Sequence, residues 1–473
     1  MLFTDAKFVY FLLVVFALFY IKPLKKYQTQ ILIAASLLFY YFNSTTFLIL
    51  LLFSASMNVL FSWLITNSNS FKTRKTFVTI GITLNVLVLV FFKYGLMLVS
   101  TFTNETSEVY NFFMIMGLPI GISFYTFEGI SLLFDTYKAR NSPGYKPVKQ
   151  NFFTHVKNVF LFISFFPHLI AGPILRANHF FPQIETKHIK NINWQYCFRK
   201  LVLGFFLKLV VANNLQYFTA WLQSPAMDNL SSLTLFVLIL GFTFQLFADF
   251  AGYSYIALGL AGLFGYQLEE NFDYPFVSSS LSELWRRWHI TLSSFLRYYV
   301  YTNLLGGGRR GKVVSLINIF LTMVLAGLWH GSKWSFAIWG SIHGSALVIE
   351  HLIKKGTKSW GFTKVRNVLG WVISYFFVIV PCMALFRFPT LQGAIDYAIL
   401  FLNNTDYKDD YRLITYLCLY SSPIVLMHLL YKYKNTRPVH YVFNKADYLV
   451  YGPMLFFIVV NGAQSSPFIY FNF

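Results

Sequence analysis

Histidine residues inside apolar segments are the strongest chemical signal in this sequence. His330 ends one apolar run and His343 lies within the next, and each is followed by glycine. An ionisable group at membrane depth is costly, so such groups are usually paired or functional. One of them could be a neutral imidazole bonded to a carbonyl group. Two in neighbouring segments, both close to tryptophan and glycine, indicate a functional site.

A third histidine, His289, follows a basic and aromatic stretch that contains Trp285, Arg286 and Arg287. Apolar residues recur at helical spacing through residues 281–301, which predicts an amphipathic helix. Two interpretations remain open. The helix could lie at the membrane interface with its basic residues facing headgroups, or it could line a cytosolic entrance for an anionic ligand.

Four other polar residues interrupt apolar segments, and structural roles suit them better than catalysis. Asp249 and Glu128 are interpreted as partners of buried Arg or Lys. His168 lies in a segment broken by prolines and is expected to satisfy the interrupted backbone. His428 stands alone on an apolar helix and is expected to be a satisfied core residue.

Known catalytic and nucleotide motifs are missing. The loop 306–312 spells G-x-x-x-x-G-K, but Val313 stands where a P-loop needs Ser or Thr. No strand precedes it, as a dinucleotide fold would require, so we interpret it as a basic loop that fixes topology or attracts coenzyme A. The sequence contains no H-E-x-x-H, no G-x-S-x-G and no clustered Cys or His, so no metal site is predicted.

The composition places these residues in a membrane protein. Of 473 residues, 56% are hydrophobic and only 12% are charged, whereas soluble domains are about 25% charged. This excludes a soluble enzyme, a disordered chain and a collagen-like fibre. The net charge of +20 resides in short loops beside apolar runs, where it sets orientation. No nucleic-acid partner is therefore expected.

Apolar segments predict about twelve transmembrane helices, since a span needs about 20 apolar residues. The predicted spans cover residues 8–21, 31–42, 47–65, 77–100, 112–134, 201–221, 233–266 (broken near Gly252), 313–328, 334–349, 368–385, 411–430 and 449–461. The segment 159–175 contains two prolines and has basic residues on both sides, which predicts a re-entrant segment. The basic loops predict that both termini lie outside the cell.

Several motifs, taken together and in order, resemble those of the membrane-bound O-acyltransferases (MBOAT), in the bacterial branch that includes the alginate O-acetylation membrane protein. The likeness runs from about Gly117 to about Glu350. The motifs occupy residues 167–174, 249–254, 285–289, 327–331 and 339–344.

The resemblance implies an all-α polytopic membrane fold, in which transmembrane, re-entrant and interfacial helices form a funnel between a cytosolic tunnel and an extracytoplasmic opening. It implies that His330 is the catalytic general base and that His289 is also important. Relatives often have Asp where this chain has Tyr255 and Tyr298, so arginines nearby would lack their expected partners. The other residues expected to line the tunnel are Trp285, Arg286, Arg287, Trp329, His343 and Asp249.

The chain is expected to comprise four segments. N-terminal transmembrane helices occupy residues 1–110, the catalytic core 111–350, further transmembrane helices 351–462 and an extracytoplasmic tail 463–473. The tail resembles the F-x-Y-F-x-F ending of these proteins and of small partners in D-alanine transfer. Tyr470 is our hypothetical acyl acceptor. An aromatic belt at the interface is the alternative for the neighbouring phenylalanines, Phe468, Phe471 and Phe473.

The resemblance implies an enzyme of the bacterial plasma membrane that moves an acetyl group from acetyl-CoA to an extracytoplasmic polysaccharide or cell-wall glycan. It implies no permanently bound cofactor. Expected partners are membrane lipids, the polysaccharide acceptor and a separate extracytoplasmic acetyltransferase of the SGNH type. Acetyl is favoured over D-alanyl because the ending is fused to the chain. The alternatives are a transporter or flippase for a polysaccharide or lipid-linked sugar, and a non-catalytic scaffold.

Overall fold

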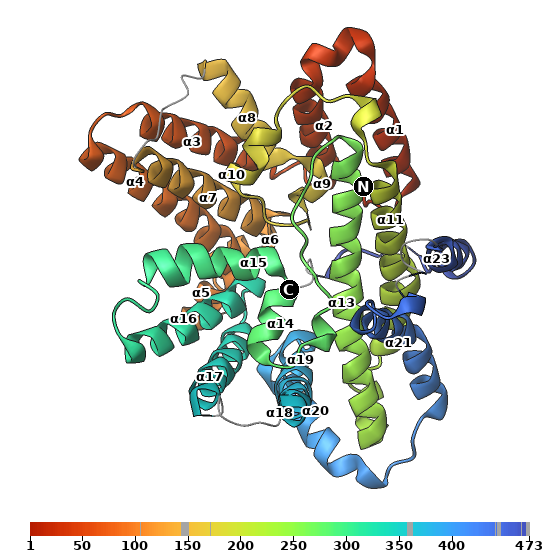
Figure 1. The fold of residues 1–473 in the computed structure, drawn as a ribbon. Coiled ribbons are helices and arrows are strands. Elements are labelled where there is room, and N and C mark those ends of the chain that lie inside the picture. Colours follow the sequence, from red (N-terminus) through yellow and green to blue (C-terminus); the bar gives the residue numbers. More distant parts are fainter. Residues whose placement is uncertain are drawn as a thin grey trace. The chain divides into compact units, whose positions relative to one another are not determined.

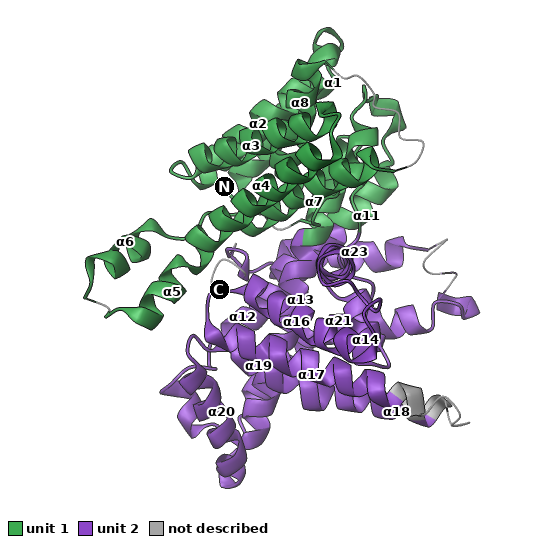
Figure 2. Ribbon diagram, turned by 90° about the vertical axis from the view of Figure 1, so that its left-hand side faces the viewer, with its two compact units in different colours: residues 1–201, 254–269 green, residues 202–253, 270–473 purple. Residues whose placement is uncertain are grey.

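In a computed structural model of the chain, the secondary-structure elements within the described residues are all helices, which confirms the all-α prediction. These residues are 1–104, 106–142, 151–170, 172–356, 363–439, 441, 446–464 and 466–469. The helices form two compact units, one made of residues 1–201 and 254–269 and the other of residues 202–253 and 270–473 (Figures 1 and 2). The four-segment division expected from the sequence stays a prediction.

Unit 1 packs its helices around aromatic rings and a few buried polar pairs. Phe8, Phe39 and Phe166 contact one another, with ring centroids 5.9 to 6.3 Å apart. The amides of Asn58 and Asn85 bond to each other between neighbouring helices. The helices of this unit are α1 (Ala6–Tyr20), α2 (Gln28–Asn43), α3 (Leu48–Asn67), α4 (Phe71–Leu89), α5 (Gly95–Phe102), α6 (Glu108–Met116), α7 (Ile122–Arg140), α8 (Phe152–Ser164), α9 (Phe166–Leu169) and α10 (Ala177–Phe180).

Unit 2 holds His289, His330, His343 and His428, whereas His168 lies in unit 1. Two helices, α11 (Trp194–Phe205) and α13 (Ser232–Leu263), contribute residues to both units. The other helical elements of unit 2 are η5 (Phe206–Ala212), α12 (Asn213–Thr219), α14 (Leu281–Arg287), α15 (Ile290–Phe295), η8 (Leu296–Leu304), α16 (Lys312–His330), α17 (Trp334–Gly356), α18 (Thr363–Val372), η9 (Ile373–Ile379), α19 (Val380–Arg387), α20 (Leu391–Asn403), α21 (Tyr411–Lys432) and α23 (Tyr448–Asn461).

The structure has fewer candidate membrane spans than predicted. Within the described ranges, eight helices are long and apolar enough to cross a membrane, or nine if α1 and the following helix, bent by 94°, form one span. The prediction of twelve is too high because α1, α2 and α23 have only 15, 16 and 14 residues. Residues 112–134 are also divided, since Gly117 and Gly121 adopt positive φ between α6 and α7.

Helix α13 is continuous, so the predicted break near Gly252 is wrong. The helix runs for 32 residues. Gly252 instead permits a close approach between helices, because a Cβ atom there would lie 2.9 Å from the carbonyl oxygen of Gly204 and 3.0 Å from the amide nitrogen of Lys208. Gly252 therefore reflects close packing of helices and not the end of a helix.

The predicted interruption of residues 159–175 is present, and its polar residues pair with each other. Helix α8 ends at Ser164 and the four-residue α9 follows. His168 Nε2 lies 2.8 Å from Glu128 Oε1, and both side chains are fully buried. The amide of Leu175 also donates to Glu128. The buried partner of Glu128 is therefore a histidine, not the Arg or Lys that we expected, and His168 bonds a side chain rather than broken backbone.

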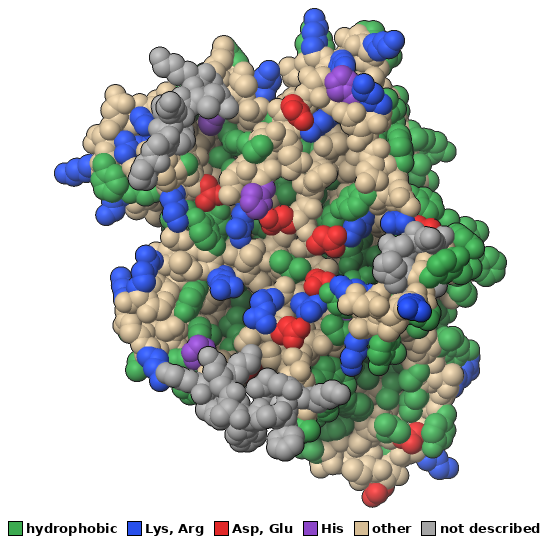
Figure 3. Space-filling view, viewed as in Figure 1, with side chains coloured by type: hydrophobic (Ala, Val, Ile, Leu, Met, Phe, Trp, Pro, Cys, Tyr) green, Lys and Arg blue, Asp and Glu red, His purple; other side chains and the backbone are tan. Residues whose placement is uncertain are grey.

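The outer surfaces of many helices are apolar, as expected for surfaces that face lipid. On α23 the side chains of Val459, Val460 and Phe456 are 84%, 65% and 59% exposed. Figure 3 shows hydrophobic side chains gathered over this helix. Water would disfavour such a surface, whereas hydrocarbon does not.

Close packing of α16 against α17 positions both intramembrane histidines. A Cβ atom on Gly340 would lie 2.4 Å from the carbonyl oxygen of Met323, and one on Gly344 would lie 3.0 Å from that of Phe320. Small residues at such positions allow helix backbones to approach closely in membranes. Gly340 beside Trp339 and Gly344 beside His343 therefore both have a packing role.

We predict that Gly340→Ala destabilises the protein by about 1–3 kcal/mol, because the added methyl group must displace backbone. The free energy of unfolding in detergent measures the effect. Gly452→Ala on α23 is the matched control, since nothing lies within 4 Å of a Cβ atom there. Equal stability of the two variants would contradict this account of the packing.

Candidate active site

The structure brings His330 and His343 together around a single indole. His330 is the last residue of α16, and His343 lies one turn beyond Trp339 on α17. The ring of Trp339 is centred 5.2 Å from that of His330 and 4.3 Å from that of His343. Both histidines are buried, with 5% and 1% of their surfaces exposed. The two histidines therefore lie around the same indole, and their role in a site stays a prediction.

Aromatic side chains from α14 and α19 complete a cage around these imidazoles. Phe386 packs edge-on against His330 at 5.2 Å. Trp285 packs in the same manner against Trp339 at 5.7 Å and against His343 at 5.5 Å. The cage encloses a cavity of about 20 Å³, which is room for about one water molecule. Its lining consists of Leu246, Phe276, Leu284, Trp285, Trp288, His330, Trp339, His343, Ile379, Met383 and Phe386.

A second, much larger pocket adjoins Trp285. Its volume is about 480 Å³, within the usual range for small-molecule sites. Arg286, Arg297 and His351 contribute basic groups, while Ile290, Leu292, Leu296, Ile319, Met323, Ala326 and Leu347 contribute apolar ones. Trp285 lines both the small cavity and this pocket. Trp285 therefore forms part of the wall of each.

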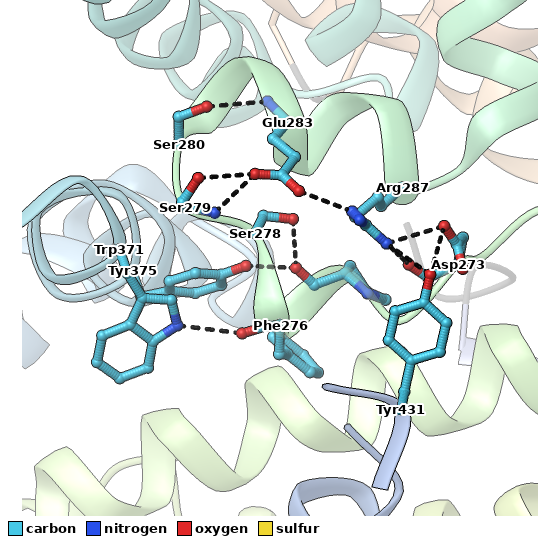
Figure 4. A network of polar contacts seen from close by, with 11 residues as sticks. Asp273, Phe276, Ser278, Ser279, Ser280, Glu283, Arg287, Trp371, Tyr375 and Tyr431 are labelled. Carbon is cyan, nitrogen blue, oxygen red and sulfur yellow. Dashed lines mark hydrogen bonds and ion pairs between the residues drawn. The ribbon is translucent and has the colours of Figure 1, made fainter. Parts of the chain in front are cut away.

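Polar contacts at both ends of α14, the helix that carries Trp285, hold this helix in place (Figure 4). At the start of the helix, the hydroxyl of Ser280 accepts from the amide of Glu283. The carboxylate of Glu350 accepts from the amides of Leu281 and Ser282, the former at 2.7 Å. These bonds satisfy amides that a helix start leaves without partners.

Arg287 belongs to this structural network. Its guanidinium lies 2.8 Å from Asp273 and 3.1 Å from Glu283, and it also donates to the Tyr431 hydroxyl (Figure 4). Arg287 therefore has acidic partners, so the expectation that it would lack them is wrong. It does not line the 480 Å³ pocket, whereas its neighbour Arg286 does.

His289 interrupts the predicted amphipathic helix. It separates α14 from α15 and adopts φ of +43°, a strained conformation for a residue with a side chain. Two contacts with Asn271 hold the following residues, since the amide of Ile290 donates to its carbonyl oxygen and the hydroxyl of Thr291 to its side-chain oxygen. No local feature of the sequence predicts this break, because it depends on the contacts with Asn271.

The imidazole of His289 is fully buried between aromatic rings. It packs edge-on against Phe250 at 4.6 Å and against Trp329 at 5.4 Å. Burial lowers the pKa of His289 to about 3, so this imidazole is neutral at physiological pH. Trp329 in turn contacts His330, with ring centroids 5.2 Å apart. The indole of Trp329 thus contacts both His289 and His330.

A buried ion pair holds the C-terminal tail in unit 2. Lys208 on η5 pairs with Asp249 on α13, and both side chains are almost fully buried. Lys208 Nζ also donates to the Ser466 hydroxyl and the Pro467 carbonyl group, at 3.1 and 3.3 Å. Asp249 Oδ2 accepts from the amide of Ile469 at 2.8 Å. The prediction that Asp249 pairs with an Arg or Lys is confirmed. Asp249 also binds the tail.

Further contacts fix the tail beside His289. Asn213 donates to the carbonyl oxygen of Gln464 at 2.8 Å. The ring of Phe468 is 1% exposed and packs against Tyr253 and Phe250, at 4.9 and 5.5 Å. Phe468 is therefore a buried anchor and not part of an interfacial belt, as the alternative interpretation proposed. Tyr470, Phe471 and Phe473 lie outside the described residues.

Sequence reasoning missed Lys208 and Asn213. Lys208 stands alone in the apolar run Phe205-Phe206-Leu207-Lys208-Leu209, and the rule that drew attention to the histidines applies equally to it. Among residues given structural roles, His428 bonds the Ile424 carbonyl group through Nδ1 and packs against Phe276, as expected of a core residue.

Comparison with known proteins agrees with this geometry. Residues 71–388 match MBOAT, the membrane-bound O-acyltransferase family. The peptidoglycan O-acetyltransferase of Helicobacter pylori is 33% identical over 352 residues, which are 70% of this chain and 65% of that protein. A probable alginate O-acetylase AlgI of Pseudomonas aeruginosa is 35% identical over 403 residues, 83% of this chain and 73% of that protein. The teichoic acid D-alanyltransferase of Bacillus subtilis is 29% identical over 272 residues, 55% and 66% of the two chains.

This chain spans less than two thirds of the length of the Helicobacter pylori relative. The family match nevertheless covers well over half of the 473 residues, including all the histidines of the cage. The buried imidazoles, the aromatic cage and the adjoining basic pocket thus lie in the matched region. The chain belongs to the membrane-bound O-acyltransferase family.

Proposed function

We propose that this chain transfers an acetyl group from a cytosolic thioester, with acetyl-CoA as donor, toward an extracytoplasmic polysaccharide or cell-wall glycan. The observation that carries the proposal is that Trp285 lines both the His330 cavity and the 480 Å³ pocket. A donor of this kind has an anionic phosphate end and a small acyl end. Arg286 and Arg297 suit the first, and the small cavity suits the second.

His330 is the general base in this proposal. A phenol or hydroxyl group is a poor nucleophile at neutral pH, while an imidazole with an ordinary pKa near 6.5 accepts its proton as attack begins. The aromatic cage excludes bulk water and so favours transfer over hydrolysis. His289 supports the site through its contact with Trp329, whose own ring contacts His330.

Tyr470 is the proposed first acceptor. The tail is anchored as far as Ile469, the preceding residue, whose amide bonds Asp249. Consecutive Cα atoms lie about 3.8 Å apart, so the chain continues to Tyr470 directly from this anchored residue. Its oxygen attacks the thioester carbon, His330 takes the proton, and the departing thiolate receives that proton. Aryl esters and thioesters are both activated, so onward transfer stays favourable.

The relatives and the fused tail favour acetyl over D-alanyl. The peptidoglycan O-acetyltransferase and the probable alginate O-acetylase are 33% and 35% identical to this chain, whereas the teichoic acid D-alanyltransferase is 29% identical. Onward transfer to the glycan falls to a separate extracytoplasmic SGNH-type acetyltransferase. We place the chain in a bacterial plasma membrane with both termini outside the cell. Membership of an acyltransferase family favours this enzyme over a transporter or flippase.

We predict that His330→Ala lowers acetyl transfer by about 10²–10⁴-fold, the usual contribution of a general base. Purified protein is supplied with labelled acetyl-CoA, and acylated peptide is measured by mass spectrometry. His188→Ala is the control, because this histidine is exposed. A folded His330→Ala protein that labels at the normal rate would overturn the role of His330.

We predict that Tyr470→Phe removes the label from the C-terminal peptide and abolishes glycan acetylation, because the nucleophilic oxygen is lost. Tyr448→Phe, at an exposed position on α23, should leave both unchanged. Normal glycan acetylation by the Tyr470→Phe protein would defeat the carrier hypothesis and leave the acyltransferase proposal intact.

We predict that Asp249→Ala releases the tail and destabilises unit 2 by about 3–5 kcal/mol, because Lys208 is left buried without its counter-charge. Digestion with a carboxypeptidase measures tail release, and denaturant unfolding measures stability. The exposed Asp406 provides the matched control, Asp406→Ala. A tail as resistant to digestion as in the unchanged protein would contradict the anchoring role of Asp249.

A further inference from the structure

We propose that the indole N–H groups of Trp339 and Trp285 form an oxyanion hole for the acyl carbonyl oxygen. This inference rests on the proposed acyl transfer at His330 and adds two catalytic residues to it. A tetrahedral intermediate of acyl transfer carries negative charge on oxygen, and hydrogen-bond donors aimed at that oxygen stabilise the transition state.

The first observation is a set of buried polar groups that lack partners. Nε1 of Trp285, Nε1 of Trp339 and both ring nitrogens of His343 are shielded from solvent and make no hydrogen bond with any of the residues that the structure describes. Native proteins rarely leave buried donors unpaired, and each such group calls for an explanation. All three side chains line the same small cavity.

The second observation is the size of that cavity. A volume of about 20 Å³ holds about one water molecule or one carbonyl oxygen, not a larger polar group. The three rings lie within 4.3 to 5.7 Å of one another. The rings that carry these unpaired nitrogens therefore line a space for about one oxygen atom, and His330 borders the same space.

Another tryptophan of this unit shows that the unpaired indoles are not a general feature. Nε1 of Trp371 donates to the carbonyl oxygen of Phe276 at 3.0 Å (Figure 4). An indole held only for its bulk would gain from such a bond, or could be a phenylalanine. Trp285 and Trp339 retain an N–H group where packing alone does not use it.

The oxyanion hole stabilises the negative charge that forms on the carbonyl oxygen during the transfer step. As the acceptor oxygen bonds to the thioester carbon, its proton passes to His330 and the electron pair of the C=O double bond moves onto oxygen. The N–H groups of Trp339 and Trp285 stabilise that charge. When the C=O bond re-forms, the C–S bond breaks, and the thiolate takes the proton from His330. No further reactant is needed.

Trp339→Phe and Trp285→Phe test the proposal, because each removes the N–H donor and keeps an aromatic ring. We expect kcat for acetyl transfer from acetyl-CoA to fall by about 10²–10³-fold in the Trp339 variant, the usual effect of losing one such donor. We expect KM to change little, since the donor acts on the transition state. Trp371→Phe is the matched control and should retain its kcat.

A second measurement separates this role from a structural one. Hydrogen bonds weaken a carbonyl bond, so the infrared stretching frequency of ¹³C-labelled acetyl donor bound to the protein should rise when a donor is removed. The proposal is overturned if both variants fold, keep the kcat of the unchanged protein and leave this frequency unaltered. An unchanged protein that transfers no acetyl group would instead refute the proposed function itself.

Discussion

Buried polar groups in this chain need partners inside the protein, because neither lipid nor aromatic side chains can replace the hydrogen bonds of water. That constraint sorts the polar residues of the apolar helices. Glu128 pairs with His168, and Lys208 pairs with Asp249, so these groups secure helices within a unit. Trp285, Trp339 and His343 remain without partners among the described residues, and they meet at one cavity. Paired groups build the fold, and we assign a substrate atom to the unpaired groups that meet at this cavity.

The Lys208–Asp249 pair illustrates why a costly interaction is kept. Replacing a buried ion pair by apolar residues is often neutral or stabilising, so stability alone is a weak reason to retain it. Here both partners also bind the tail, since Lys208 binds Ser466 and Pro467 while Asp249 binds the amide of Ile469. The tail is recognised largely through its backbone. A charged pair can hold an extended segment in this manner, and apolar side chains could not.

The sequence predicted the class, the family and the meeting of His330 with His343, because each depends on composition or on local motifs. It also predicted a basic partner for Asp249. Predictions from the sequence were wrong where tertiary contacts determine the course of the backbone. Hydropathy does not reveal that Gly117 and Gly121 divide one apolar run, nor that Gly252 serves helix packing inside a continuous helix. The strained turn at His289 depends on Asn271, 18 residues earlier in the sequence, and no local propensity signals it.

Acyl transfer must be faster than hydrolysis of the donor. The position of Trp285 indicates how one side chain can both exclude water and stabilise the developing charge. As part of the wall of each, its side chain borders a pocket large enough for a donor and a cavity with room for about one water molecule. As a donor, its N–H group would bind the carbonyl oxygen in the place that a water molecule could otherwise occupy. Binding of the acyl group then displaces the solvent molecule best placed to attack it. Exclusion of water and stabilisation of charge are thus the same contact, and no separate lid is required to protect the activated acyl group.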